Sequence, residues 1–265
     1  MKAEKHGEII SFSGGRTSAY MTKRLIDENP KENYLVIFCN TGKEAPETLD
    51  FVNKCDKRWK LGVIWLEYRK GNKYEVVNYK SASRDGRPFD ELIENHKGFL
   101  PNTIRRFCTV SLKIDTLRRY LKDQGFTSWS SYVGIRYDEP RRWNKADISP
   151  NYVDVIHPLV TWRITKQNVL DFWAAQDFDL KLKEPYGNCD CCFLKSKSKL
   201  LTIAKERPDL LEWWIKHEQN TEKYQNKSSG GFKQNITYKQ ILEISSSQIG
   251  LFDDEPNFEC FCNID

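Results

Sequence analysis

The stretch Ser13-Gly-Gly-Arg-Thr-Ser18 stands between an apolar run, Glu8 to Phe12, and a helix-like segment. This glycine-centred turn predicts several backbone N–H groups and two hydroxyls at a helix N-terminus, a place that binds phosphate and other anions. An ordinary strand-to-helix turn capped by serine or threonine is the plain alternative. The turn lacks the Gly-Lys-Ser/Thr ending of a P-loop and the spacing of a dinucleotide fingerprint, so it supports neither of those motifs.

Short apolar runs alternate with helix-length amphipathic segments up to about residue 175. We expect strands at 8–13, 34–39, 63–66, 129–135 and 153–156, and helices at 17–27, 46–59, 110–121 and 164–175. A polar, poorly periodic stretch runs from about 81 to 101. This order is typical of βαβ units and predicts an α/β fold, a Rossmann-like, doubly wound parallel sheet covered on both faces.

The pattern changes at residue 184, where a cysteine-rich turn precedes expected helices at 196–206 and 208–217. We therefore divide the chain into a nucleotide-binding domain, 1–183, and a cysteine-rich, mostly helical appendage, 184–265. The sequence leaves the oligomeric state open, and a homo-oligomer is compatible with it.

Charge and cysteine content bound the function. The 265 residues carry 42 basic and 37 acidic side chains, a net charge of +5, so binding to nucleic acid would need a local basic patch. No segment resembles a signal peptide or a membrane span, which predicts a cytoplasmic protein with no membrane contact. In that compartment, eight cysteines indicate a metal, cluster or redox role more readily than disulfides.

Two further polar turns follow later strands. Asn40-Thr-Gly-Lys-Glu44 follows the second strand, and Gly134 to Arg142 follows a later one. Because the carboxyl ends of neighbouring parallel strands share an edge, we expect one crevice in which arginine forks grip phosphate or sulfate. A solvated helix start is the alternative for the arginine segment. The expected nucleotide ligands are Ser11, Ser13, Gly14, Gly15, Arg16, Thr17, Ser18, Asn40, Thr41, Gly42, Glu44, Gly134, Arg136, Arg141 and Arg142.

These motifs together resemble the phosphoadenosine phosphosulfate (PAPS) reductase family of the adenine-nucleotide alpha-hydrolase-like, or PP-loop, superfamily. Ser11 to Ser18 resembles the superfamily's pyrophosphate loop, and Asn40 to Thr48 resembles the family's aspartate-threonine-glycine segment. Cys108 to Lys113, Gly134 to Arg136 and His157 to Trp162 follow in the family's order. The resemblance covers roughly residues 8–195 and implies an enzyme that binds an adenine nucleotide, with Lys113 beside the nucleotide as a catalytic residue.

The chain departs from the pattern at two positions. Thr17 stands where related ATP pyrophosphatases usually carry aspartate, and Asn40 stands where the second turn begins with aspartate. The nucleotide therefore remains open among PAPS, adenosine phosphosulfate (APS) and ATP.

Cys189-Asp-Cys-Cys192 contains a Cys-x-x-Cys pair, which lets two thiolates reach one metal or cluster. A thioredoxin-like redox pair is another interpretation. The resemblance to the iron–sulfur branch of the reductases implies a [4Fe–4S] cluster on Cys108, Cys189 and Cys192, with zinc as the alternative cofactor. Phe107 occupies the first position of that branch's tandem cysteines, so the fourth ligand must be Cys191, Cys260 or Cys262, of which Cys262 is favoured.

Glu259-Cys260 resembles the glutamate-cysteine of the reductase C-terminus and implies that Cys260 attacks sulfur to form a thiosulfonate. A role for Cys260 as a cluster ligand stays open beside it, and Cys39 and Cys55 are expected to be core cysteines. The leading hypothesis is an oxidoreductase that reduces PAPS or APS to sulfite with a thiol partner such as thioredoxin.

Two alternatives remain. One is an ATP pyrophosphatase-type sulfurtransferase that adenylates a nucleic acid or small molecule for thiolation. The other is a non-catalytic nucleotide-sensing or nucleic-acid-binding module with structural zinc.

Overall fold

A six-stranded sheet forms the centre of the computed structural model, which describes residues 4–71, 73–144, 152–187, 189–220 and 231–247. All neighbouring strands pair in parallel except the edge strand β4, which is antiparallel to β3. In sheet order the strands are β4 (Lys73–Val77), β3 (Ile64–Arg69), β2 (Tyr34–Asn40), β1 (His6–Ser11), β5 (Ser128–Val133) and β6 (Val153–Ile156). The predicted Rossmann-like, doubly wound α/β fold is confirmed.

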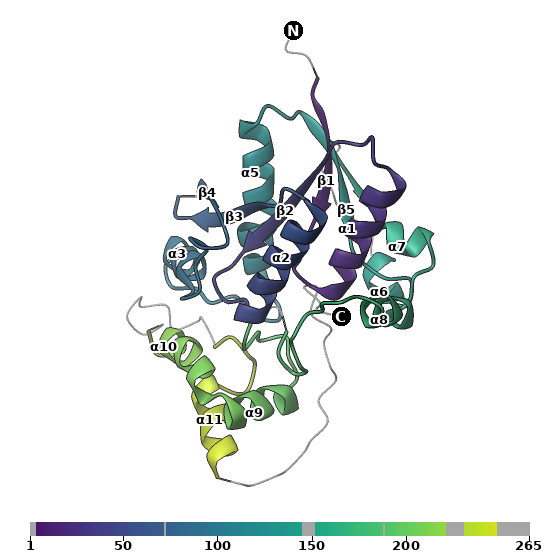
Figure 1. Ribbon diagram of the computed structural model, residues 1–265. Coiled ribbons are helices and arrows are strands. Elements are labelled where there is room, and N and C mark those ends of the chain that lie inside the picture. The colour runs from purple at the N-terminus through teal and green to yellow at the C-terminus, as the bar shows by residue number, and fades with distance from the viewer. Residues whose placement is uncertain (1–3, 72, 145–151, 188, 221–230, 248–265) are drawn as a thin grey trace.

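Successive side chains of a strand point to opposite faces of the sheet, and both faces are covered here. Ile10 on β1 packs with residues of α1 (Arg16–Glu28), α2 (Pro46–Trp59) and α8 (Lys166–Ala174). Its neighbour Ile9 packs instead with Leu121 of α5 (Thr116–Asp123). Figure 1 shows α1 and α2 in front of the sheet and α5 behind it.

Several elements escaped the sequence reasoning. The stretch interpreted as polar and aperiodic contains α3 (Arg87–Asn95), which buries Phe89, Leu92 and Ile93. Strand β4 and α11 (Tyr238–Ser246) were also missed. The remaining elements are α4 (Phe107–Thr109), the π-helical η1 (Val110–Asp115), α6 (Pro140–Trp143), α7 (Pro158–Thr161), α9 (Lys197–Glu206), the 3-10 helix η2 (Pro208–Leu211) and α10 (Glu212–Asn220).

A second apolar cluster joins the late helices to the sheet domain. It combines Phe89 and Leu92 of α3 and Leu112 of η1 with Trp214 of α10 and Ile241 of α11. In Figure 1, α9, α10 and α11 lie together beyond the end of the sheet from which α1 and α2 start. The late helices are therefore packed beside the edge where the predicted ligand turns lie.

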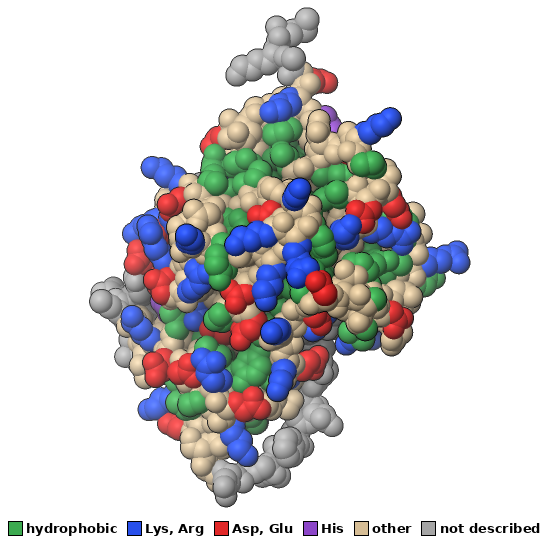
Figure 2. Space-filling model, in the orientation of Figure 1, with side chains coloured by type: hydrophobic (Ala, Val, Ile, Leu, Met, Phe, Trp, Pro, Cys, Tyr) green, Lys and Arg blue, Asp and Glu red, His purple; other side chains and the backbone are tan. Residues whose placement is uncertain are grey.

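The described surface is mixed in charge. Figure 2 shows basic and acidic side chains interspersed over one face, in keeping with a net charge of +5 for the whole chain. Among the described residues, no helix is long and apolar enough to cross a membrane.

Candidate functional site

The glycine turn after β1 leads directly into α1. Gly14 has φ +82°, a left-handed conformation that glycine adopts without steric cost. Gly15 is the N-cap of α1, and within the described chain no side chain caps this helix start. The first turn of α1 also contains no acidic residue. Its backbone N–H groups and the positive end of the helix dipole therefore suit an anion.

Two serine hydroxyls organise this turn. Ser18 Oγ donates to the Gly15 carbonyl at 3.0 Å and accepts from Ser13 Oγ at 2.9 Å and from Ser13 N at 3.2 Å. Ser18 is buried, so its hydroxyl shapes the loop from inside. Ser11, on β1, has its Oγ 3.3 Å from Ser131 Oγ of β5.

The turn after β5 packs onto the start of α1. A Cβ at Gly134 would lie 3.1 Å from Ser18 Cα, so glycine permits this close approach. Arg136 donates from Nη1 to Thr17 Oγ1 at 3.4 Å. Strands β2, β1 and β5 are neighbours in the sheet, which confirms the prediction that the three turns follow adjacent strands.

Carboxylates hold two of the three arginines predicted as ligands in the segment Gly134 to Arg142. Arg136 is buried, and its Nε donates to Asp138 Oδ1 at 2.9 Å. Burial opposes the charge on Asp138, but hydrogen bonds from Lys166 N and Arg136 lower the pKa of its carboxyl. Arg142 is also buried and pairs with Glu139, whereas Arg141 is exposed.

The Arg16 side chain extends to the segment that follows α8 and binds Asp179 and Leu180 there. Its Nε and Nη2 donate to the two carboxylate oxygens of Asp179 at 2.7 and 2.8 Å, and Nη2 also donates to the Leu180 carbonyl at 2.6 Å. A forked pair of this kind fixes a guanidinium in one orientation. Its contribution to anion binding would therefore come from the backbone N–H.

The second turn is built around buried polar groups. Asn40 is fully buried; its Nδ2 donates to Glu67 Oε1 at 2.6 Å and its Oδ1 accepts from Gly42 N at 3.1 Å. Thr41 donates from both N and Oγ1 to Glu44 Oε2 at 2.8 Å. Asn40 thus links β2 to β3, and Glu44 folds the turn back on itself.

Glu44 and Lys113 face one another across this turn. Glu44 Oε1 is buried without a hydrogen-bond partner in the described structure, and it lies 3.9 Å from Lys113 Nζ of η1. Burial raises the pKa of the Glu44 carboxyl, while Lys113 and the two donors of Thr41 act in the opposite direction. A buried carboxylate and a lysine therefore stand at the edge where the ligand turns meet.

The cysteine turn lies directly against this second turn. Cys189 forms an isolated antiparallel bridge with Glu44, and its Sγ is 3.7 Å from Thr41 Oγ1. Cys189 and Cys192 are each 8% exposed, and Cys108 packs against the apolar cluster that contains both. The structure thus brings the Cys-x-x-Cys pair to the same sheet edge as the predicted nucleotide turns.

The remaining described cysteines, Cys191, Cys39 and Cys55, differ in how far they are buried. Cys191 is fully buried, and burial raises the pKa of its thiol well above the usual value. Cys39 is half-buried against the apolar cluster that contains Ile9 and Leu121, and burial raises the pKa of its thiol to about 12. Cys55, a residue of α2, is fully enclosed in the core. These environments agree with core roles for Cys39 and Cys55.

Thiolates are the donors that iron–sulfur clusters and structural zinc both use, so the residue types fit either cofactor. Among the described residues, however, no three Cys, His, Asp or Glu side chains already surround a common metal position. Cys260 and Cys262 lie outside the described residues.

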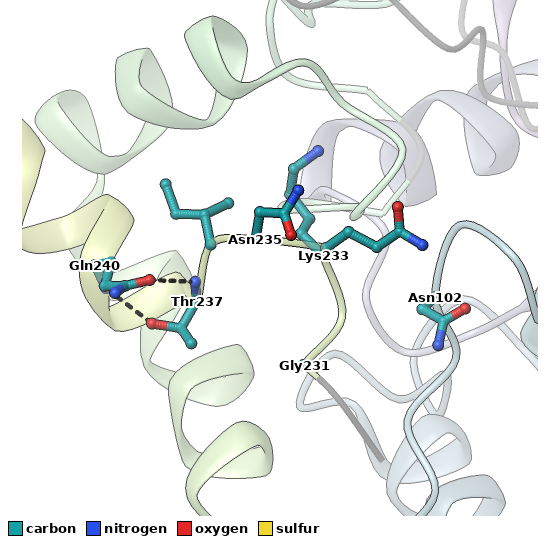
Figure 3. Close-up of a pocket in the computed structure, with 8 residues that line it drawn as sticks. Asn102, Gly231, Lys233, Asn235, Thr237 and Gln240 are labelled. Atoms are coloured by element: carbon teal, nitrogen blue, oxygen red, sulfur yellow. Dashed lines mark hydrogen bonds between the residues drawn. The ribbon is translucent and has the colours of Figure 1, made fainter. Parts of the chain in front are cut away.

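A separate cavity of about 550 Å³ lies between Asn102 and the segment 231–240. Figure 3 shows Asn102 on the opposite side of the cavity from Lys233 and Asn235, and it shows hydrogen bonds between Thr237 and Gln240. These reciprocal hydrogen bonds form the capping box of α11. The Thr237 and Gln240 side chains are therefore already used to stabilise the start of the helix. The sequence-predicted ligands lie elsewhere, at the ends of β1, β2 and β5.

The sequence reasoning missed Asp179, Lys43 and Asp190. Asp179 could not be found because its partner, Arg16, is 163 positions away in the chain. Lys43 lies in the polar turn 40–44 and Asp190 lies in the cysteine turn 189–192. Neither residue was predicted to have a role, because their neighbours are the expected nucleotide and metal ligands. The charge of Asp190 between two cysteines was the available signal.

The chain belongs to the phosphoadenosine phosphosulfate reductase domain family, whose model matches residues 8–181. A relative from Escherichia phage lambda, described as uncharacterized nin region protein ORF290, is 30% identical over 214 residues, which are 76% of this chain and 71% of that protein. The uncharacterized protein MJ0973 of Methanocaldococcus jannaschii is 25% identical over 228 residues, 81% of this chain. The match spans only 48% of that archaeal relative's length.

Two solved structures show a distant likeness. A phosphoadenylyl-sulfate (PAPS) reductase from Candida auris, in a phosphate complex, has 17% identity and a TM-score of 0.40 over 65% of this chain and 73% of its own. The U34-tRNA thiolase NcsA from Methanococcus maripaludis, with its [4Fe-4S] cluster, has 16% identity and a TM-score of 0.45 over 99% and 80%. Likeness at this level does not assign a reaction.

Proposed function

We propose that this protein is an adenine-nucleotide-dependent sulfur enzyme that reduces a sulfonucleotide, PAPS or APS, to sulfite. One observation carries the proposal: the bridge between Glu44 and Cys189 holds the cysteine turn against the turn after β2, and the neighbouring strand β1 leads into the uncapped start of α1. An anion-binding helix start and thiols at one sheet edge are the two components that sulfonucleotide chemistry needs. Membership of the PAPS reductase family supports the same chemistry.

The phosphosulfate would bind at the start of α1. Backbone N–H groups of Arg16 and Thr17 supply donors there, and the Arg136 guanidinium is hydrogen-bonded to Thr17. The Ser13 hydroxyl would donate to the ligand by exchanging its bond to Ser18 Oγ. Lys113 would add positive charge from η1. The full proposed nucleotide set is Ser11, Ser13, Gly14, Gly15, Arg16, Thr17, Ser18, Asn40, Thr41, Gly42, Glu44, Gly134, Arg136, Arg141 and Arg142.

The first turn of α1 favours a sulfonucleotide over a metal-bound triphosphate. Mg²⁺ prefers carboxylate ligands, and this turn contains no acidic side chain. Thr17 instead receives a hydrogen bond from a guanidinium. The local charge is therefore suited to an anion bound by the protein's own donors.

In the proposed reaction the Cys260 thiolate attacks the sulfur of the sulfonucleotide. A bond forms between cysteine sulfur and sulfate sulfur, the bond from that sulfur to the bridging phosphate oxygen breaks, and the nucleotide phosphate leaves. One thiol of a dithiol partner such as thioredoxin then attacks Cys260 Sγ and forms a mixed disulfide, while sulfite leaves with the electron pair of the sulfur–sulfur bond. The partner's second thiol displaces the Cys260 thiolate, so the partner ends as a disulfide and Cys260 is regenerated.

A cofactor is proposed on Cys108, Cys189, Cys192 and Cys262, with a [4Fe–4S] cluster preferred to zinc. When bound, the cluster would set the electrostatic field around the sulfonucleotide. Anaerobic purification with iron, sulfide and zinc analysis tests this choice. About four irons with sulfide is the expected result, and stoichiometric zinc without sulfide would contradict it.

The reaction is tested with the anaerobically purified full chain, thioredoxin and labelled PAPS or APS. We expect sulfite release that Cys260→Ser abolishes while nucleotide binding persists; Cys55→Ala, in the core, is the matched control that keeps turnover. Sulfite release by Cys260→Ser would sink the assignment. Pyrophosphate release from ATP on adding RNA or DNA would indicate the sulfurtransferase, and tight nucleotide binding without turnover would indicate the non-catalytic module.

A further inference from the structure

We propose that Lys43 and Asp190 are a positioning pair that holds the cysteine turn, Cys189 to Cys192, against the nucleotide-side turn, Thr41 to Glu44. This role rests on the proposed function: the pair keeps the proposed cofactor ligands Cys189 and Cys192 at the sheet edge where the nucleotide binds, without itself binding nucleotide. Within the described part of the chain, the hydrogen bonds and the ion pair of Lys43 and Asp190 reach one another, Thr41, Cys191 and Trp214 and no residue of the helix start at 13–18, so we assign them a role distinct from anion binding.

The pair is a buried salt bridge between two motifs far apart in the chain. Lys43 Nζ lies 2.8 Å from Asp190 Oδ2, and each side chain is only 9% exposed. Removing one member of such a pair leaves the other as an uncompensated buried charge, which strongly favours separation of the two turns. An exposed pair would have no comparable effect.

Backbone contacts run alongside the ion pair. Asp190 N donates to the Lys43 carbonyl at 2.8 Å, and the Glu44–Cys189 bridge lies next to this bond. Asp190 Oδ1 also accepts from Cys191 N at 2.6 Å and from Trp214 Nε1 at 2.9 Å. One carboxylate therefore sets the cysteine turn against both the sheet edge and α10.

Trp213 covers the lysine. Its ring centroid is 5.0 Å from Lys43 Nζ, a cation–π contact, and its Nε1 donates to Asp90 of α3 at 2.7 Å. A Cβ at Gly86 would lie 2.7 Å from Trp213 Nε1 and 3.0 Å from Lys43 Cδ. The lysine is thus enclosed on several sides, and its ammonium group has one orientation toward Asp190.

The thiols owe part of their protection to this arrangement. Cys189 and Cys192 are each 8% exposed, and Cys189 is joined to the second turn through Glu44 and Thr41. Alkylation therefore requires a local opening of the two turns, whose frequency the ion pair controls. Displacement of this turn would also move the proposed cofactor ligands away from the nucleotide edge, and the electrostatic field that the cofactor sets around the sulfonucleotide would weaken.

The test measures iodoacetamide alkylation of each cysteine by mass spectrometry in the full chain purified anaerobically, both as isolated and after a chelator has removed any bound metal, so that thiols held by a cofactor are compared with thiols held by the fold alone. In Lys43→Met we expect alkylation of Cys189 and Cys192 at least tenfold faster than in the wild type. Cys55, fully buried in α2, reports global unfolding and should not change. Lys43→Arg restores the charge and should return the rates to within threefold of the wild type.

Lys233→Met is the matched control, because it removes a lysine whose Nζ donates to the carbonyls of Phe193 and Lys195, just after the cysteine turn. We expect wild-type alkylation in this variant. Equal acceleration in Lys43→Met and Lys233→Met, or acceleration at Cys55 as well, would overturn the proposal. If Lys43→Met does not fold, Asp190→Asn is measured by the same criteria.

Kinetics separate positioning from binding. With PAPS as substrate, Lys43→Met should lower kcat at least tenfold with KM unchanged, whereas a raised KM at constant kcat would assign Lys43 to nucleotide binding and overturn the proposal. If the wild type releases no sulfite, the proposed reaction is wrong. The alkylation rates alone then show whether Lys43 and Asp190 hold the cysteine turn in place.

Discussion

Replacing Gly14 by alanine tests why the ligand turn has its shape. Gly14 has φ +82°, a conformation that costs an L-residue about 1–2 kcal/mol. The new Cβ would also lie 2.8 Å from Thr48 Cγ2 and 3.1 Å from Val52 Cγ2, both on fully buried residues of α2. Overpacking at such a site costs about 1–3 kcal/mol. The sum is a loss of about 2–5 kcal/mol in the free energy of unfolding.

Gly125→Ala separates the two contributions. Gly125 has φ +83°, and a Cβ there would meet nothing within 4 Å, so this variant bears only the backbone cost of about 1–2 kcal/mol. Urea unfolding of the wild type and both variants, followed by fluorescence and circular dichroism, measures the difference. Gly14→Ala should be less stable than Gly125→Ala by about 1–3 kcal/mol. Equal losses would refute the packing argument.

Three further predictions concern other residues. Burial raises the pKa of Glu218 to about 7, so between pH 4.5 and 7 the native state holds a proton that the unfolded state has lost. Stability therefore falls by about 2 kcal/mol as pH rises through that window, and Glu218→Gln should lack this fall in urea unfolding at pH 5 and 8; an identical fall in the variant would contradict the assignment. Arg16→Met breaks the forked pair with Asp179, which is partly exposed, and should lower the free energy of unfolding by about 1 kcal/mol. The affinity for PAPS, measured by calorimetry, should change less than threefold in this variant, and a tenfold loss would place the guanidinium on the phosphate. Cys191→Ala should retain the metal or cluster that Cys189→Ala loses, and metal analysis of the purified variants measures this. The reverse pattern would make Cys191 a cofactor ligand in place of Cys189.

Much of the sheet was predictable because buried parallel strands are short apolar runs separated by helices. The expected helix at 46–59 and strand at 153–156 coincide with α2 and β6. Glycine turns signalled where the strands end, and the strand order then placed those turns at one edge. Local patterns carry this information because each strand and turn is encoded by adjacent residues.

The missed features depend on contacts between distant residues. Helix α3 is stabilised because Phe89 and Leu92 pack on the late helices. Most other residues of this short helix are polar, so the helical spacing of its apolar residues is hard to recognise in the sequence. Nothing near Arg16 indicates that its side chain would turn to Asp179. Likewise, the salt bridge of Lys43 with Asp190 exists only because the fold brings residues 147 positions apart (190 − 43) together. Such pairings follow from tertiary structure and not from local propensity.

The apolar cluster shared by α3, η1 and the late helices has a practical consequence for protein engineering. The family match stops at residue 181, yet Phe89, Leu92 and Leu112 complete their packing against residues beyond that point. A chain truncated at 183 would leave this apolar surface in water, where such patches cause self-association. Expression of the family segment alone should therefore yield aggregates, and grafting experiments within this family need to carry the late helices with the sheet.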